Sequence, residues 1–406
     1  MRFLNFFSIL PLLGTMALAK VDDPAADKAQ SHTEYALFRS ANMASADKLA
    51  SGIGFHSFRI PAVVRTKTGR LIAFAEGRRH NNRDFGDINL VYKRTKSTAG
   101  EGKTISDWEG LREVVGKGDG TWGNPTAVVD EDNTIYLWMS WNNGSYSQTG
   151  LSLHDGTPTK PIDDTWEGRR HLFLSTSKDD GGTWSDPVDY TETLTPEGRA
   201  WDAVGPGIGI RLSTGELVVP AQARNLVARG EPGNRKWEVQ DVPGGGSEGT
   251  IVELPNGQLQ RNDRKSGGYR IVSYGTLEDG FGEFKQDPGL PDPGCQGSIL
   301  SYNRNEELNR TIFMNAADKK SRRTMRVRVS YDDDVAKYNY GRKLDDAPVP
   351  KSGYQGGYSS MVKTGDYHIG ALVESDFFND GSNGDSYRTI LWRRFNLSWI
   401  LNGPNN

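Results

Sequence analysis

Short apolar runs recur along the whole chain, and each is followed by a tight polar turn and a second apolar run. The six turns are Thr68-Gly69, Asp132-Asn133, Thr214-Gly215, Asn256-Gly257, Leu308-Asn309 and Thr364-Gly365, of which Leu308-Asn309 is the weakest. Gly and Asn readily adopt the positive φ of hairpin turns, so each segment predicts two antiparallel strands. The pattern predicts an all-β protein, and no segment predicts a helix long enough for an α/β fold.

The hairpins recur at a regular spacing. Between Gly69 and Gly365 the mean interval is about 59 residues, which is roughly the length that a four-stranded sheet unit needs. We therefore expect one domain over residues 20–406, folded as a six-bladed β-propeller with four-stranded antiparallel blades. A large β-sandwich or jelly roll is the alternative that the spacing alone leaves open.

A second repeated element is the sequence S-K-D-D-G-G-T-W from Ser177 to Trp184. It predicts a hairpin turn in which Asp179 caps backbone N–H groups, glycine takes the tight conformation and the tryptophan packs on the sheet. Weaker copies are expected at 276–284 and 330–338, and a degenerate copy at 97–105. Asp179 is therefore expected to be structural and not catalytic.

The first nineteen residues predict a cleaved signal peptide (1–19). Arg2 gives a positive start, Leu4 to Met16 is mostly apolar, and Ala17-Leu18-Ala19 is a small-residue cleavage site. A buried N-terminal helix is the alternative. A membrane anchor is disfavoured because the run is shorter than the ~20 residues that a span needs. We therefore expect a secreted, extracellular protein.

Composition limits the partners and the chemistry. The 48 glycines and 10 tryptophans of the 406 residues favour short strands and tight turns, and the net charge of −3 gives no reason to expect a nucleic-acid partner. No later segment predicts a membrane span. The single cysteine, Cys295, allows no internal disulfide and is expected to be a buried small residue. Sequons for N-glycosylation begin at Asn143, Asn309 and Asn396.

Two stretches hold the candidate chemistry. F-R-I-P contains Arg59, a candidate anion anchor, and E-G-R-R-H-N-N-R-D-F-G-D contains Asp84, a candidate acid in a polar loop between two strands. With F-R-I-P upstream and the turn motif, which is an Asp-box, the chain resembles the sialidase family of glycoside hydrolases. It resembles in particular the secreted fungal members, including those that prefer Kdn. Asp-boxes also occur in unrelated propellers, so the box alone does not give the function.

The resemblance covers most of the mature chain, because the catalytic motifs also fall in the family's order. It implies that Arg59, Arg264 and Arg322 form the family's arginine triad. Arg264 closes the segment that begins at Ser247-Glu248, and Arg322 precedes the strand T-M-R-V-R-V-S. Arg261 and Arg323 are the neighbouring alternatives.

The resemblance also implies roles for three further residues. Tyr358, in Q-G-G-Y-S-S-M, matches the nucleophile, and Glu374, in A-L-V-E-S, matches the residue that holds the first arginine. Arg78, in E-G-R-R, matches a residue that touches the sugar near C4.

The chemistry of a sialic acid explains these residue types. The substrate has a carboxylate on its anomeric carbon, and arginine binds a carboxylate through two parallel hydrogen bonds. A neutral phenol avoids the repulsion that a carboxylate nucleophile would meet, but tyrosine titrates near ~10 and needs a base, for which Glu248 is the candidate. Asp84 would protonate the leaving oxygen and then activate water, so the anomeric configuration is retained. We expect the pKa of Asp84 to be raised above that of a free aspartate.

The resemblance thus implies an exo-alpha-sialidase that hydrolyses terminal Neu5Ac or Kdn from sialylated glycans. It would need no cofactor or metal, bind no membrane or nucleic acid, and act as a monomer or weak dimer. A non-catalytic lectin would keep the arginines but lose a catalytic residue, and a structural propeller would need no such arginines. A trans-sialidase would keep every catalytic residue, with Trp141 and Trp166 as candidate acceptor platforms. Residues 144–170 predict a polar insertion at the pocket rim.

Overall fold

The structure is a computed structural model that describes residues 23–41, 43, 45–116, 118, 120–302, 308–344, 356–375 and 389–403. The predicted signal peptide at 1–19 lies outside these residues. The helices of the described part are short: η1 (Pro24–Asp27), η2 (Ile105–Asp107), α1 (Thr191–Leu194) and α2 (Leu397–Leu401). None of them has the length and apolar character needed to cross a membrane. The all-β prediction is confirmed.

The largest sheet has nine strands, in the order β11-β10-β7-β6-β4-β3-β2 with β12 on β6 and β5 on β4. Its strands are β2 (Ser57–Arg65), β3 (Leu71–Arg78), β4 (Ile88–Arg94), β5 (Arg112–Val115), β6 (Thr121–Val129), β7 (Ile135–Asn142), β10 (His171–Ser177), β11 (Val188–Asp189) and β12 (Gly207–Ile208). An insertion between β7 and β10 holds a separate two-stranded sheet of β8 (Tyr146–Ser147) and β9 (Lys160–Pro161).

Four further sheets are separate from the nine-stranded sheet. The first has β13 (Ile210–Arg211), β14 (Leu217–Ala221), β15 (Arg224–Arg229) and β16 (Lys236–Asp241). The second has β17 (Gly249–Glu253), β18 (Leu259–Asp263), β19 (Tyr269–Thr276), β20 (Gly280–Phe281) and β21 (Lys285–Pro291). The third has β22 (Ser298–Ser301), β23 (Thr311–Ala316), β24 (Met325–Ser330) and β25 (Tyr340–Lys343). The fourth has β26 (Ser359–Lys363), β27 (Ile369–Ser375), β28 (Thr389–Phe395) and β1 (His32–Phe38).

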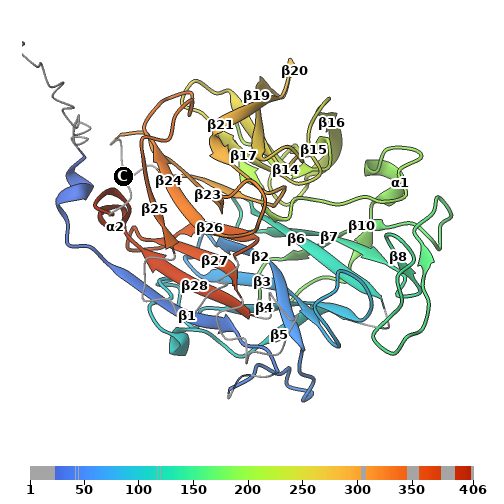
Figure 1. Cartoon of the computed structure of the whole chain (residues 1–406). Coiled ribbons are helices and arrows are strands. Elements are labelled where there is room, and N and C mark those ends of the chain that lie inside the picture. Colours follow the sequence, from blue (N-terminus) through green and yellow to red (C-terminus); the bar gives the residue numbers. More distant parts are fainter. Residues whose placement is uncertain are drawn as a thin grey trace, which may run out of the picture.

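The sheets form a propeller (Figure 1), in which the inner strands contact one another in a closed ring. β2 contacts β6, β6 contacts β13 and β14, β14 contacts β17, β17 contacts β22, β22 contacts β26, and β26 contacts β2. The fourth separate sheet joins the two ends of the chain, because β1 pairs antiparallel with β28. In Figure 1 the blue β1 accordingly lies beside the red β28. Buried apolar clusters fill the spaces between neighbouring sheets.

The prediction of six separate four-stranded blades is confirmed only in part. The nine-stranded sheet contains two antiparallel runs, β2 to β5 and β6-β7-β10-β11, which are not separate from each other. They join where Ile88 of β4 pairs in parallel with Thr121 of β6, because the amide of Ile88 donates to the carbonyl of Gly120 at 3.2 Å. Hydrogen bonding therefore leaves four separate blade-like sheets and one shared sheet.

The turns predicted from the sequence lie where they were expected. Each joins two antiparallel neighbours: β2 and β3, β6 and β7, β13 and β14, β17 and β18, β22 and β23, and β26 and β27. The Asp-box at 177–184 joins β10 to β11, and Asp179 accepts from the amide of Thr183 at 2.9 Å. Trp184 packs edge-on against Phe74 and Tyr92, as a structural motif should.

Two inner strands have a bulge at the residue before a proline. In β2 the register shifts between Arg59 and Ala62, and Ile60 has a φ of 56°. In β6 it shifts between Gly123 and Thr126, and Asn124 has a φ of 54°. Bulges bend a strand and redirect its side chains, and they are frequent beside active sites. Ile60 and Asn124 both line the pocket described next.

Candidate active site

A cavity of about 720 Å³ brings together residues that are far apart in the sequence. Its size is in the range typical of small-molecule sites. The residues that line it are Arg59, Ile60, Glu76, Arg78, Arg83, Asp84, Phe85, Asn124, Ser147, Gln148, Thr149, Leu151, Ser152, Arg170, Trp201, Ala203, Gln222, Ser247, Glu248, Arg264, Arg322 and Tyr358. Seven of the eight residues predicted from the sequence line this cavity, and the eighth, Glu374, contacts Arg59.

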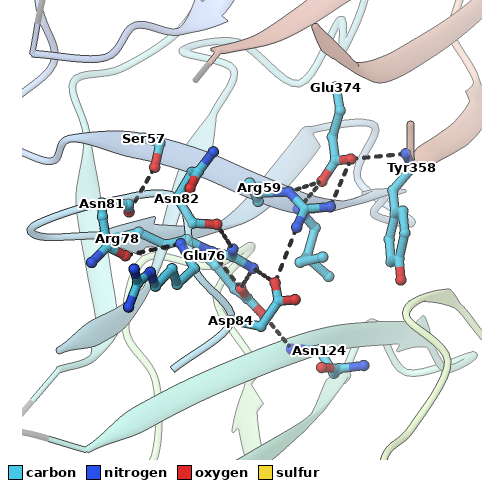
Figure 2. A network of polar contacts seen from close by, with 12 residues as sticks. Ser57, Arg59, Glu76, Arg78, Asn81, Asn82, Asp84, Asn124, Tyr358 and Glu374 are labelled. Atoms are coloured by element: carbon cyan, nitrogen blue, oxygen red, sulfur yellow. Dashed lines mark hydrogen bonds and ion pairs between the residues drawn. The ribbon is translucent and has the colours of Figure 1, made fainter. Parts of the chain in front are cut away.

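Glu374 holds Arg59 in a fixed orientation. The carboxylate accepts from Nε and Nη2 of Arg59, both at 3.1 Å, in a bidentate pair (Figure 2). It also accepts from the amides of Ile60 at 2.9 Å and Tyr358 at 3.0 Å. Burial opposes ionisation of Glu374, but the attraction of Arg59 and these hydrogen bonds outweigh it and lower the pKa of the carboxyl group. Glu374 therefore ties together the two strand ends that carry Arg59 and Tyr358.

Asp84 lies between two arginines. Its Oδ1 accepts from Nη1 of Arg59 at 3.0 Å and lies 2.7 Å from Nη2 of Arg78 (Figure 2). Its side chain is 70% exposed, whereas those of Arg59 and Arg78 are 7% and 2% exposed. A carboxylate that solvent reaches, held by fixed guanidinium groups, can meet a ligand directly.

The pKa expected for Asp84 was wrong in direction. Desolvation in the pocket raises the pKa of Asp84, but the attraction of Arg78 and Arg59 outweighs it and brings the pKa well below the usual range. The expectation assumed an acid ready to donate and did not include the two guanidinium groups that lie beside the carboxylate. In the free protein Asp84 is therefore ionised.

Tyr358 lies among the three predicted triad arginines. Its hydroxyl donates to Oε1 of Glu248 and accepts from Nη1 of Arg264 at 2.7 Å. The guanidinium carbons of Arg59 and Arg322 lie 5.5 Å and 5.4 Å from the centre of its ring. Burial raises the pKa of Tyr358 well above its ordinary value, the negative charge of Glu248 raises it further, and Arg264 lowers it. The phenol proton is therefore directed at a carboxylate.

The two alternative arginines lie elsewhere. Arg261 is fully buried and pairs with Asp263, Nε to Oδ1 at 2.9 Å and Nη2 to Oδ2 at 2.8 Å. Arg323 is exposed, and neither residue lines the cavity. Arg264 follows β18 directly, and Nη1 of its side chain donates to Oε2 of Glu248 at 2.8 Å. The structure thus brings Arg264 and Arg322, and not their neighbours, to Tyr358.

Cys295 is buried directly behind this group, as expected for a small core residue. It forms one apolar cluster with Ile60 and Tyr358, and its side chain has no exposure. Burial raises the pKa of its thiol to about 12, so the thiol is protonated and packs as an apolar group. It gives Tyr358 a rigid apolar backing.

Several pocket residues were missed by sequence reasoning. Glu76 is 3% exposed and contacts Arg78. Asn124 contacts Arg170, which is also 3% exposed. Arg170 stacks on Trp201, with its guanidinium carbon 4.6 Å from the centre of the ring. Glu76 was within reach of sequence analysis, because residues i and i+2 of a strand share a face and Arg78 was already a candidate. No local motif marks Asn124 or Arg170.

The predicted polar insertion does lie at the pocket. Ser147, Gln148, Thr149, Leu151 and Ser152 line the cavity, and Nη1 of Arg83 donates to the carbonyl of Ser152 at 2.6 Å. The two candidate acceptor platforms do not line it. Trp141 packs against Trp122, His171 and Phe173, and Trp166, although 57% exposed, stacks edge-on with His171. In the part of the chain that the structure describes, no three His, Cys, Asp or Glu side chains cluster so as to hold a metal.

Comparison with known proteins shows the family to which the chain belongs. Residues 69–370 match the model of the BNR repeat-like domain. The chain is 66% identical over 408 residues to an exo-alpha-sialidase of Aspergillus fumigatus, with both chains covered completely. It is 65% identical to an exo-alpha-sialidase of Arthroderma benhamiae, over 98% of this chain and 97% of the other.

Solved structures show the same fold at much lower identity. The intramolecular trans-sialidase from Ruminococcus gnavus matches with a TM-score of 0.70 and 16% identity, over 86% of this chain and 96% of that chain. A Hadza microbial sialidase matches with a TM-score of 0.69 and 21% identity, over 91% and 69%. These structures support the assignment of the fold, and the sequence matches support the assignment of the family. The chain belongs to the exo-alpha-sialidase family that includes the two fungal proteins.

Proposed function

We propose that this protein hydrolyses terminal α-linked sialic acids, Neu5Ac or Kdn, with retention of anomeric configuration. Tyr358 is the nucleophile, Glu248 its base, and Asp84 the acid and later the base. Arg59, Arg264 and Arg322 bind the substrate carboxylate, and Arg78 contacts the sugar. The two fungal exo-alpha-sialidases, 66% and 65% identical, support this activity.

The observation that carries the proposal is the position of the Tyr358 hydroxyl between Glu248 and Arg264. The hydroxyl donates to Glu248 and accepts from Arg264 at 2.7 Å. Glu248 takes the phenol proton as the oxygen attacks the anomeric carbon, and the arginine stabilises the developing phenolate. Because burial raises the pKa of Tyr358, such a base is required for the phenol to react.

Asp84 completes the two-step reaction. In the first step it protonates the glycosidic oxygen as the bond to the anomeric carbon breaks and the tyrosyl–sugar bond forms. In the second it accepts a proton from water, which attacks the same carbon and releases the phenolate to recover its proton from Glu248. Two inversions give net retention.

The free pocket holds Asp84 ionised, so the acid form has to arise when substrate binds. Arg59 donates to Asp84 through Nη1 at 3.0 Å, and a substrate carboxylate on the triad would compete for this donor. The new negative charge and the lost pairing both raise the pKa of Asp84. The arginine that anchors the substrate thereby controls the charge of the acid.

Fluorophore release from matched α-linked Neu5Ac and Kdn substrates tests the proposal. Turnover of either is expected, and the ratio of their kcat/KM values decides the preference at C5. Proton NMR of the first product anomer should show retention. Binding of both substrates without turnover would favour a lectin instead, and an inverted first product would remove Tyr358 from its role.

Three further features are proposals of the same kind. The two antiparallel runs of the nine-stranded sheet count as two blades, which gives six in all; the closed ring of contacts from β2 through β26 supports this count.

The protein is secreted after cleavage before Lys20, which N-terminal sequencing of protein from the culture medium would test. It acts as a monomer or weak dimer, which light scattering would test.

A further inference from the structure

Glu76 is a buried carboxylate of the pocket to which the proposed reaction gives no role. It lies on β3, two residues before Arg78, and is 3% exposed although it lines the cavity. Its Oε2 accepts from Nε of Arg78 at 3.0 Å and from Nη2 at 2.5 Å. Its Oε1 accepts from the amide of Asn124 at 3.0 Å (Figure 2). One carboxylate thus contacts two different walls of the pocket.

The first contact leads to Asp84. The same Nη2 of Arg78 lies 2.5 Å from Glu76 and 2.7 Å from Oδ1 of Asp84. The two carboxylate oxygens therefore cannot be farther apart than the sum of these distances. With its Nε and Nη2 held by Glu76, the buried guanidinium of Arg78 has one orientation in which to meet Asp84.

The second contact leads to Asn124 on the neighbouring strand β6. Asn124 has a φ of 54°, which is uncommon outside glycine although asparagine adopts it more readily than most residues, and the bond from its amide to Glu76 helps to hold that conformation. Its side-chain oxygen accepts from Nη2 of Arg170 at 2.9 Å. A Cβ on Gly123 would lie 2.3 Å from Oε1 of Glu76, so this close approach requires glycine.

We propose that Glu76 is a positioning residue that aligns Asp84 through Arg78 and fixes the adjoining pocket wall through Asn124. Its second effect is electrostatic. The positive charges beside Asp84 are Arg59, Arg78 and Arg322, with Arg170 more distant. Two carboxylates share these arginines with Asp84: Glu374 shares Arg59, and Glu76 shares Arg78. A neighbouring negative charge disfavours a second one, so the charge of Glu76 partly offsets the attraction of the Arg78 that it holds against Asp84. The role rests on the proposed function of Asp84.

Glu76→Gln keeps the shape of the side chain and removes the charge. The amide can still accept from Asn124 but presents donors to the donors of Arg78, which therefore turns away from its present position. We expect kcat to fall by about 10- to 100-fold, as for a small misplacement of a reacting group, with little change in KM. The alkaline limb of kcat should move to higher pH, since Arg78, whose charge lowers the pKa of Asp84 most, turns away and this outweighs the loss of the Glu76 charge.

Gly123→Ala separates position from charge. The new methyl group displaces the Glu76 carboxylate without neutralising it. We expect a similar fall in kcat with a smaller movement of the alkaline limb. This variant also decides the matter if Glu76→Gln fails to fold, because an unchanged kcat in folded Gly123→Ala would overturn the positioning role.

Asp130→Asn is the matched control. Asp130 follows the opposite end of β6, is fully buried, and pairs with Arg235 through two bonds, Nε to Oδ2 at 2.7 Å and Nη2 to Oδ1 at 2.6 Å. It does not line the pocket. Its variant should lose stability and keep both kcat and the pH limb. If it moved the limb as far as Glu76→Gln, the effect would not be specific and the inference would fail.

A crystal structure of Glu76→Gln distinguishes this inference from the proposed function. Arg78 and the peptide of Asn124 are expected to leave their present positions. If both stay in place, Glu76 does not position them, whatever the activity. If the wild-type protein turns over neither Neu5Ac nor Kdn substrate, the proposed function fails independently of where Arg78 lies in the variant.

Discussion

Asp84 and Glu374 contact the same arginine but have opposite surroundings. Glu374 lies on β27 with no exposure, and both of its oxygens contact Arg59 and a backbone amide each. Asp84 lies in the loop between β3 and β4, is 70% exposed, and meets Arg59 through one oxygen. One carboxylate is part of the scaffold, and the other is available to a ligand.

The difference shows which contacts a substrate can change. The partners of Glu374 are fixed by strands, so a bound sugar leaves them intact. One partner of Asp84, Arg59, is a guanidinium group that a sialic acid carboxylate would also seek. The pKa of both groups is lowered in the free protein, but only that of Asp84 would respond to substrate. Exposure thus separates a reactive carboxylate from a structural one when charge alone does not.

The largest expected effect is the loss of turnover in Asp84→Asn. Loss of general acid–base catalysis lowers kcat by about 10²- to 10⁴-fold, and the exposed side chain should leave the fold intact. Steady-state kinetics and thermal unfolding measure both. Asp87→Asn, in the same loop but outside the active pocket, is the control and should retain activity. Near-normal turnover in Asp84→Asn would remove its catalytic role.

Glu374→Gln should act on binding and stability together. Breaking a buried ion pair costs about 3–5 kcal/mol of unfolding free energy, because Arg59 is left without its charged partner. We expect KM to rise by about 100-fold, since Arg59 loses its orientation and misplaced binding groups lose much of their effect. Chemical denaturation and kinetics give the two quantities. A variant with wild-type stability would show that Glu374 is not the scaffold carboxylate described here.

The pH dependence sharpens the comparison further. Because the pKa of Asp84 is lowered in the free protein, kcat/KM should fall with rising pH from a low value onward. The substrate carboxylate raises this pKa, so the alkaline limb of kcat should lie at higher pH than that of kcat/KM. Binding of an unreactive sialic acid analogue should also take up a proton, which calorimetry in buffers of different ionisation enthalpy detects. Coincident limbs and no proton uptake would contradict the exchange at Arg59.

The fold was predictable because its signals are local. The turn at Thr68-Gly69 and the Asp-box at 177–184 each specify a hairpin within a few residues. The joining of two antiparallel runs into one nine-stranded sheet was not predictable, because it depends on the amide of Ile88 meeting the carbonyl of Gly120. That contact arises from how the chain packs in three dimensions, and no local sequence pattern indicates it.

The site divides in the same way. Arg59 and Tyr358 belong to motifs and could be named from the sequence, whereas Asn124 and Arg170 are brought to the pocket by a bulge and a loop that no motif announces. The expected direction of the pKa shift of Asp84 was wrong for a related reason. Its direction depends on Arg59 and Arg78 lying within 3.0 Å, which only the assembled pocket decides.

The smallest effect is expected at a third carboxylate, Asp179 of the Asp-box. It accepts from Ser177 Oγ and the Thr183 amide, both at 2.9 Å, and from Thr183 Oγ1 at 2.8 Å, in an exposed turn outside the pocket. Asp179→Ala should cost about 1 kcal/mol of unfolding free energy, since solvent can replace these bonds in part. Its kcat and KM should equal those of the wild type. Loss of activity at unchanged stability would instead place this carboxylate with Asp84, which its turn contacts give no reason to expect.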